Sequence, residues 1–141
     1  NHVSNVIAAI GRTQLARLAS EVAPARRRIV QPYRNRLKGV PGLALLEMNM
    51  EGIVSHIHPV RILDGRKPEI ARKLEEVGIP TGYHYKPNHL LTLFGGGSER
   101  LPNSEQLGEE LLTVPLHPAL NYEDIEFICG SLIAALGQKA K

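Results

Sequence analysis

The sequence predicts an α+β domain in which a small mixed or antiparallel sheet is packed with helices. Apolar residues recur at helical spacing near both ends of the chain, whereas the middle alternates with the period of two that is typical of strands. The expected order is two helices, two strands, and then helices and short extended segments in turn, which implies this fold class. With 141 residues, 43% of them hydrophobic, the chain is long enough to bury one core.

Two helices are expected before the sheet, the first at residues 4–23 and the second from Pro24 onward. Ser4 suits the N-cap of the first helix, and a proline is tolerated in the first turn of the second. Pro32 falls inside the second helix, where a proline costs on the order of 3 kcal/mol. We therefore expect a kink or break at residues 28–31.

Strands are expected at residues 43–47 and 53–63, and a short one at residues 81–85. The second strand has two faces, which carry Val54, His56, His58 and Val60 on one side and Ser55, Ile57, Pro59 and Arg61 on the other. Because proline cannot donate a hydrogen bond to a neighbouring strand, Pro59 predicts an edge position or a bulge.

Helices and loops make up the rest of the chain. A helix is expected at residues 68–77, with an inward face formed by Ile70, Leu74 and Val77. A loop follows at residues 86–97, Ser104 opens the next helix, and residues 112–116 are extended.

The last helix is the clearest element of the sequence. Asn121 and Asp124 have the spacing of a capping box, in which each side chain accepts a hydrogen bond from the backbone of the other residue. The stripe that follows predicts burial along one side of the helix and consists of Ile125, Ile128, Cys129, Leu132, Ile133 and Leu136.

Composition and charge narrow the classes of function. The net charge of +3 is uneven, because residues 12–38 are basic and residues 98–126 are acidic. Nucleic acid is disfavoured as a partner, since the chain has only four tyrosines, two phenylalanines and no nucleic-acid motif. No stretch approaches the roughly 18 apolar residues of a membrane helix, so no membrane partner is expected. The single cysteine fits a reducing compartment, and a cytoplasmic location is expected.

Six histidines provide the candidate metal ligands. On a strand, His56 and His58 point to the same side and, with His84 or His89, could build a zinc site. Because neither a cysteine nor a carboxylate accompanies the pair, histidines half-buried on a strand are the preferred interpretation, and no metal site is predicted.

Residues 83–89, with the sequence YHYKPNH, form the densest group of polar side chains. They offer two imidazoles, two phenols and one ammonium at a strand-to-loop junction, where a rigid scaffold tends to present binding groups. Such a cluster suits an anionic ligand, for example a diphosphate or a carboxylate. The alternative is a loop that packs its aromatic rings on the core.

Three segments carry further motifs. They are SNVIAAIGRTQL at residues 4–15, GIPTGYHYKPNH at residues 78–89, and LTVPLHP at residues 112–118 followed by EDI at residues 123–125. In their order and spacing they resemble the DegT/DnrJ/StrS family of sugar aminotransferases, and they span nearly the whole chain. The resemblance implies a fold like that of the C-terminal domain of aspartate-aminotransferase-type transferases, which depend on pyridoxal phosphate.

Under this resemblance, residues 1–141 are the C-terminal, small domain of such an enzyme, including the helix at about residues 3–23 that leads into it. The implied reaction transfers an amino group, usually from glutamate, to a keto carbon of a nucleotide-linked sugar. The implied partners are an N-terminal large domain, whose lysine holds pyridoxal phosphate, and a second copy in a homodimer. No lysine here lies in a segment like that of the catalytic lysine. The chain alone is therefore expected to be inactive and not to bind the cofactor covalently.

The resemblance also implies roles for individual residues, none of them catalytic. His84 and Tyr85 stand at the family's substrate-contacting pair, and the neighbouring Lys86 and His89 are further candidates for substrate binding. Lys86 is the one lysine expected near the site. Asn1 and His2 fall in a segment that reaches across the dimer toward the cofactor, and His2 stands where arginine is usual.

Two other functions remain open at this point. A stand-alone interaction module derived from this domain would pair through the helix at residues 3–18. A basic phosphate-binding domain would use the three adjacent arginines at residues 26–28.

Overall fold

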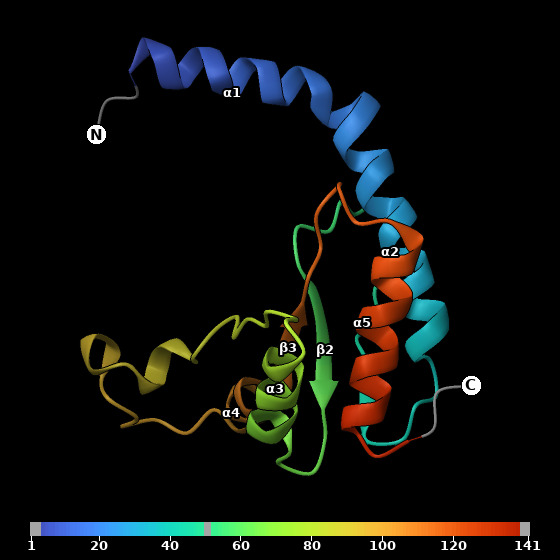
Figure 1. Cartoon of the computed structure of the whole chain (residues 1–141). Helices are drawn as coiled ribbons and strands as arrows, with labels where there is room; N and C mark the ends of the chain where they lie inside the picture. Colours follow the sequence, from blue (N-terminus) through green and yellow to red (C-terminus); the bar gives the residue numbers. More distant parts are fainter. Residues whose placement is uncertain (1–3, 50–51, 139–141) are drawn as a thin grey trace.

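The computed structural model describes residues 4–49 and 52–138 and has the predicted α+β class (Figure 1). Its elements in chain order are α1 (Asn5–Arg17), the π-helical turn η1 (Leu18–Val22), α2 (Ala23–Leu37), β1 (Leu43–Leu45), β2 (His58–Ile62), α3 (Lys67–Glu76), the 3-10 turns η2 (Asn88–Leu90) and η3 (Thr92–Phe94), α4 (Pro102–Glu110), β3 (Leu111–Val114) and α5 (Tyr122–Ala135). The strands form one antiparallel sheet in the order β1-β2-β3. Helices α2 and α5 lie side by side next to the sheet, and α3 packs against α5 (Figure 1).

The core lies between the sheet and the helices α2, α3 and α5. Burial alternates along β2, where His58, Val60 and Ile62 are inside, as the period of two predicts. Tyr33 of α2 is fully buried, stacks on the His58 ring and donates a hydrogen bond from its hydroxyl to the Pro115 carbonyl at 3.0 Å. This contact joins α2 to the segment after β3, and burial of the apolar stripe of α5 is also confirmed.

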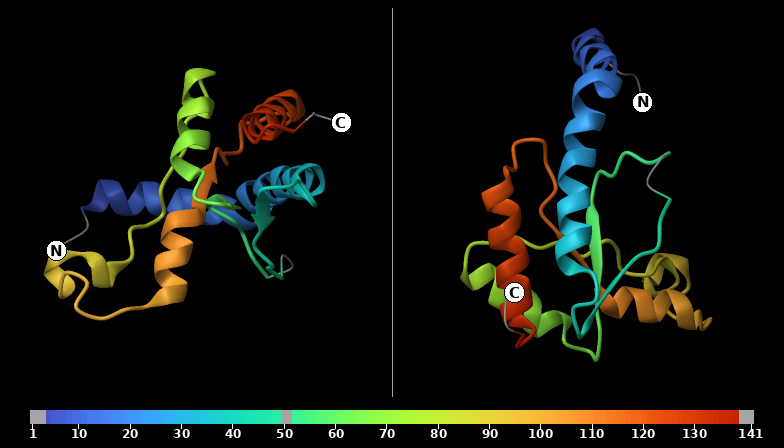
Figure 2. Two further views of the ribbon diagram at one scale, coloured as in Figure 1. Left: turned by 90° about the horizontal axis from the view of Figure 1, so that it is seen from below. Right: turned by 90° about the vertical axis from the view of Figure 1, so that its right-hand side faces the viewer.

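The helices α1 and α2 join through η1 into one continuous helical segment that bends, and its first part stands away from the rest of the molecule (Figure 1 and Figure 2). The predicted N-cap is confirmed, because the Ser4 hydroxyl accepts from the backbone of Ile7. The predicted break at residues 28–31 is wrong, since α2 runs through Pro32 without interruption. The carbonyl that loses its partner belongs to Arg28, an exposed residue that water can reach.

The sheet differs from expectation at several places. The strand predicted at residues 53–63 is reduced to β2 (His58–Ile62), and the one predicted at residues 43–47 is reduced to β1 (Leu43–Leu45). Pro59 was expected at an edge or a bulge, but it lies in the central strand β2 opposite Thr113. This correction has a simple reason: the pairing of β2 with β1 stops at Val60, so the β1 side of Pro59 lies beyond the ladder and needs no N–H. The strand predicted at residues 81–85 shrinks to a single bridge between Gly82 and Thr113, which extends the β3 edge.

The predicted ends and faces of the later helices are confirmed in part. The capping box of α5 is confirmed, because Asn121 and Asp124 exchange hydrogen bonds of 2.9 Å. By contrast, Val77 is 50% exposed, not inward, because α3 ends at Glu76 and Val77 is already its C-cap. Helix α4 begins at Pro102, not at Ser104, since proline is well placed in the first turn.

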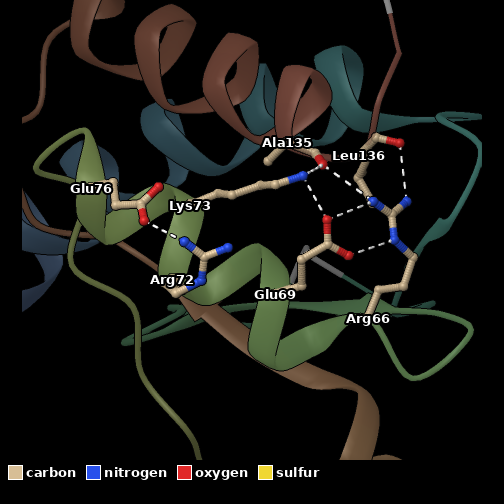
Figure 3. Close-up of polar contacts among 7 residues, drawn as sticks. All are labelled: Arg66, Glu69, Arg72, Lys73, Glu76, Ala135 and Leu136. Atoms are coloured by element: carbon tan, nitrogen blue, oxygen red, sulfur yellow. Dashed lines mark hydrogen bonds and ion pairs between the residues drawn. The ribbon is translucent and has the colours of Figure 1, made fainter.

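The C-terminal end of α5 is held by charged side chains of α3 and of its N-cap residue (Figure 3). Arg66 donates to the carbonyls of Ala135 and Leu136, and Lys73 donates to Ala135. Glu69 lies between the two cations and pairs with both. The free carbonyls at the end of a helix carry partial negative charge, so these cations stabilise the packing of α3 on α5.

Candidate functional site

The candidate site is a cavity of about 230 Å³ beside the edge of β3. It is lined by Lys67, Tyr83, His84, Tyr85, Lys86, Pro87, Leu90, Gly108, Glu109 and Leu111. Three of the four residues predicted to bind substrate, His84, Tyr85 and Lys86, therefore meet at one cavity. They are carried by a loop that crosses from α3 and the sheet edge toward α4.

His84 is fixed against the sheet. Its Nδ1 lies 3.0 Å from the Thr113 hydroxyl, and two backbone hydrogen bonds of 2.9 and 2.8 Å tie Gly82 to Thr113. Gly82 leaves room for the ring, because a Cβ there would lie 2.5 Å from Cε1 of His84. The imidazole is thus held by Nδ1, and no other described residue forms a hydrogen bond with its Nε2.

Tyr85 and Lys86 point toward solvent at the mouth of the cavity. Tyr85 is 74% exposed, and its ring meets the His84 ring edge-on with centroids 4.8 Å apart. Lys86 is also exposed. The pair therefore presents a phenol and an ammonium that can reorient around a ligand, which suits recognition of an anionic group.

His89, the fourth predicted residue, lies outside the cavity lining. Its Nε2 is 3.2 Å from Glu105 of α4, which also accepts from Arg100 and from the backbone of Leu101. Hydrogen bonds from Arg100 and from the Leu101 backbone, with a smaller one from His89, lower the pKa of Glu105 to about 2. His89 thus fastens η2 to α4.

Lys67 is a member of the site that the sequence did not reveal. Lys86 was expected to be the one lysine near the site, and this is wrong, because Lys67 also lines the cavity. Its Nζ donates to the Gly108 carbonyl and lies 5.0 Å from the centre of the Tyr83 ring. A buried lysine at the start of a helix leaves no pattern in the sequence, because its neighbours come from segments far along the chain.

Four lysines lie among the described residues, and each amine has different surroundings. Lys67 is engaged by Gly108 and Tyr83, and Lys73 by Glu69 and Ala135. Lys86 is exposed on a loop, and Lys38 lies at the end of α2 away from the cavity. None of these four amines is held, unengaged, in an enclosed cavity.

The two histidines that were expected to be half-buried on one strand, His56 and His58, differ in burial and in secondary structure. His58 is buried on Tyr33, whereas His56 lies before β2 and is exposed. Within residues 4–49 and 52–138, no group of three or more histidine, cysteine or acidic side chains could hold a metal ion. The same residues contain no helix long and apolar enough to span a membrane.

The basic stretch at residues 26–28 is partly engaged within the fold. Arg26 donates to the Ser55 carbonyl at 2.9 Å, and Arg27 donates to the Ile53 carbonyl at 3.4 Å. These contacts hold the chain before β2 against α2, which weakens the alternative of a phosphate-binding patch. The candidate cofactor residues Asn1 and His2 lie outside the described residues.

Comparison with known proteins identifies the family and relatives of this chain. The model of the DegT/DnrJ/EryC1/StrS aminotransferase family matches residues 1–133. The dTDP-4-dehydro-2,3,6-trideoxy-D-glucose 4-aminotransferase of Saccharopolyspora spinosa is 30% identical over 127 residues, which are 89% of this chain and 32% of the relative. The UDP-4-amino-4-deoxy-L-arabinose–oxoglutarate aminotransferase of Shewanella sediminis is 22% identical over 98% of this chain and 39% of its own.

Solved structures show the same fold. The aminotransferase TlmJ of Streptoalloteichus hindustanus superposes with a TM-score of 0.84 at 35% identity, over 94% of this chain and 36% of its own. DesV of S. venezuelae has a TM-score of 0.81 at 28% identity, over 90% of this chain and 35% of its own. This chain thus spans about a third of the length of the relatives it matches. With its sequence motifs, family match and sugar-aminotransferase fold, the chain belongs to the DegT/DnrJ/EryC1/StrS aminotransferase family.

Proposed function

We propose that this chain is the C-terminal domain, residues 1–141, of a cytoplasmic aminotransferase that depends on pyridoxal phosphate and acts on a nucleotide-linked keto sugar. Glutamate is the proposed amino donor. Two relatives, a dTDP-sugar and a UDP-sugar aminotransferase, support this class of substrate. In this proposal an N-terminal large domain supplies the lysine that holds the cofactor, and a homodimer completes the site.

The observation that carries the proposal is the cavity at which His84, Tyr85 and Lys86 meet. Lys86 supplies a mobile positive charge for a diphosphate, and the Tyr85 hydroxyl supplies a donor beside it. His84, held by Thr113 through Nδ1, offers Nε2 at a defined position. His89 does not line the cavity, and its proposed role is indirect: it holds η2 against α4 through its contact with Glu105.

The exposed apolar face of α1 supports the proposed partners. Val6, Ile7, Ile10 and Leu15 are each more than half exposed. Apolar side chains gathered on one helix are typical of a surface that another domain or subunit covers. Asn1 and His2 precede this helix, and we propose that they reach the cofactor of the partner subunit.

Ligand binding is tested with thymidine diphosphate and uridine diphosphate, titrated into the chain and followed by nuclear magnetic resonance. Lys86→Met is expected to weaken binding about tenfold, because a charge-assisted hydrogen bond to phosphate is lost. The matched control is Lys38→Met, which removes the same charge at the exposed end of α2. Equal affinity of wild type and Lys86→Met would contradict the proposed site.

The proposed absence of the catalytic lysine is tested separately. After incubation with pyridoxal phosphate and reduction with borohydride, peptide mass spectrometry is expected to find no lysine modified stoichiometrically. The reason is that the amines near the cavity are either engaged, as in Lys67, or exposed, as in Lys86. Stoichiometric attachment in the wild type that disappears in Lys86→Arg would place the cofactor on this chain and refute the proposal.

A further inference from the structure

We propose that Lys67 is a positioning residue. It holds the ligand-binding loop at residues 83–87 in place and does not itself bind the ligand. The inference rests on the proposed function, because it takes this loop to be the one that binds. It starts from an unfavourable feature of the fold: among the described residues, a buried lysine at the start of a helix has no carboxylate as ion-pair partner.

Lys67 is the first residue of α3, and only 7% of it is exposed. Burial deprives the ammonium of hydration, and the N-terminal end of a helix carries the positive end of its dipole. Within residues 4–49 and 52–138, no carboxylate forms an ion pair with Lys67. Burying a cation at this position costs free energy, and we attribute its presence to the two groups that it contacts.

Those two groups lie on different elements. The Lys67 ammonium donates to the Gly108 carbonyl of α4, and it lies 5.0 Å from the centroid of the Tyr83 ring in a cation–π contact. Lys67 therefore joins α3 and α4 to the start of the loop.

Gly108 also receives the far end of the loop. A Cβ at Gly108 would lie 2.8 Å from Cγ and Cδ of Pro87, so the proline ring rests directly on the glycine. Lys67 thus contacts Tyr83 itself and the residue that seats Pro87. Lys67 is therefore in contact with both anchors of the loop, Tyr83 at one end and Gly108 at the other.

The residues between these two anchors are the ones proposed to bind. His84 has its own anchor on Thr113, but Tyr85 and Lys86 are exposed and are placed by the backbone on either side of them. If Tyr83 and Pro87 moved, Tyr85 and Lys86 would move with them. The geometry therefore assigns Lys67 to the placement of Tyr85 and Lys86.

This role differs from general support of the fold in one measurable way. Replacing a buried ionic group by a well-packed apolar side chain of similar volume is often neutral for stability, and neither contact of Lys67 is made to a residue of the buried core. Lys67→Met is therefore expected to leave the thermal midpoint of the 141-residue chain unchanged or higher, while the loop becomes more mobile.

The test compares amide hydrogen exchange and tyrosine ring resonances in the wild type, Lys67→Met and Lys67→Arg. The Gly82 amide, which donates to the Thr113 carbonyl at 2.9 Å, reports on the root of the loop. In Lys67→Met it should exchange about tenfold faster, as expected for loss of one cation–π contact, and the Tyr83 ring should approach unfolded chemical shifts. Lys67→Arg retains the cation over the ring and should restore most of the protection.

Lys38→Met is the matched control and should leave both signals as in the wild type. Unchanged Gly82 exchange and Tyr83 resonances in Lys67→Met would overturn the inference. So would a lower thermal midpoint with uniformly faster exchange, which would mean that Lys67 only supports the fold. If the loop loosens as expected but the wild type binds neither nucleoside diphosphate, the positioning role stands and the proposed function fails.

Discussion

At the scale of single residues, two glycines shape the candidate site through the side chains that they lack. Gly82 gives room to the His84 ring, and Gly108 gives room to the Pro87 ring. At Gly11 and Gly52, by contrast, an added Cβ would meet nothing within 4 Å. The four glycines cannot be told apart in the sequence, because the clash depends on which residue the fold brings next to each.

Gly82→Ala is expected to displace the His84 imidazole. The added methyl group would lie 2.5 Å from Cε1, so the ring must turn away and lose its contact of 3.0 Å with the Thr113 hydroxyl. The His84 ring resonances should shift, and affinity for thymidine diphosphate should fall about tenfold, as for the loss of one hydrogen bond to a ligand. Gly52→Ala is the control, and an unmoved His84 signal in Gly82→Ala would count against this arrangement.

Predictability of the site also differs between residues. The motif GIPTGYHYKPNH pointed to His84, Tyr85 and Lys86, and these three do share a cavity. His89 belongs to the same motif, yet it is turned to Glu105. A motif shows which residues stand together in the chain, but the direction of each side chain is decided by the neighbours that packing supplies.

At the scale of elements, α3 is the helix that connects the site to the rest of the fold. One end of it contributes Lys67 to the cavity, while Arg66, Glu69 and Lys73 meet the C-terminal end of α5 (Figure 3). Hydrogen bonds from Arg66 and then Lys73 lower the pKa of Glu69 to about 2. The stabilisation from this carboxylate is therefore present above its ordinary pKa and is lost as the pH falls toward 2.

Glu69→Gln is expected to lower the urea midpoint at neutral pH, because two cations near the end of α5 lose their shared counter-charge. The effect should shrink in high salt, since the group is exposed enough to be screened. Glu76→Gln is the matched control, because Glu76 pairs with Arg72 on the outer face of the same helix and, among the residues that the structure describes, forms no ion pair toward α5. Equal shifts for the two variants would show that the bridge to α5 contributes nothing specific.

Element boundaries followed the sequence where a local signal was present. The capping box at Asn121 and the N-cap at Ser4 involve residues three positions apart, so they could be read directly. The break predicted near Pro32 was wrong, because the free-energy cost of the proline is visible in the local sequence but the packing that offsets it is not. Ile29, Tyr33 and Leu37 are buried against other elements and keep α2 helical.

At the scale of the whole molecule, acid sensitivity is expected to arise from His58. Burial lowers the pKa of His58 to about 4, and the charge of Arg34 adds to the effect. The unfolded chain binds this proton near pH 6.5, whereas the folded chain binds it only near pH 4. The contribution of neutral His58 to the free energy of unfolding is therefore fully present above pH 6.5. It should fall by on the order of 3 kcal/mol as the pH drops through that window.

Urea unfolding between pH 4 and pH 7 measures this loss. His58→Phe keeps a ring against Tyr33 but cannot titrate, so its stability should depend less on pH over this range. His56→Phe, at an exposed position two residues away, should behave like the wild type. A wild-type curve that is flat from pH 4 to pH 7 would contradict the buried, neutral state of His58.

The overall shape leads to an expectation about association. Helix α1 stands away from the body and exposes Ile7 and Ile10 (Figure 1). Sedimentation velocity of the chain is expected to show association that grows with concentration and is reduced in Ile10→Asp. Gln14→Asp adds the same charge to the same helix and serves as the control. A wild-type chain that stays monomeric at all concentrations would remove support for a partner surface on α1.

By itself the sequence determined the fold class, the helix caps, the alternation of β2 and membership of the family, because each of these depends on residue types at short, regular spacings. Only the tertiary structure decided that Pro59 lies in the central strand, that His89 turns to α4 and that Lys67 enters the cavity. These features depend on contacts between segments distant in the chain. Burial sets their energies, and burial is a property of the assembled fold.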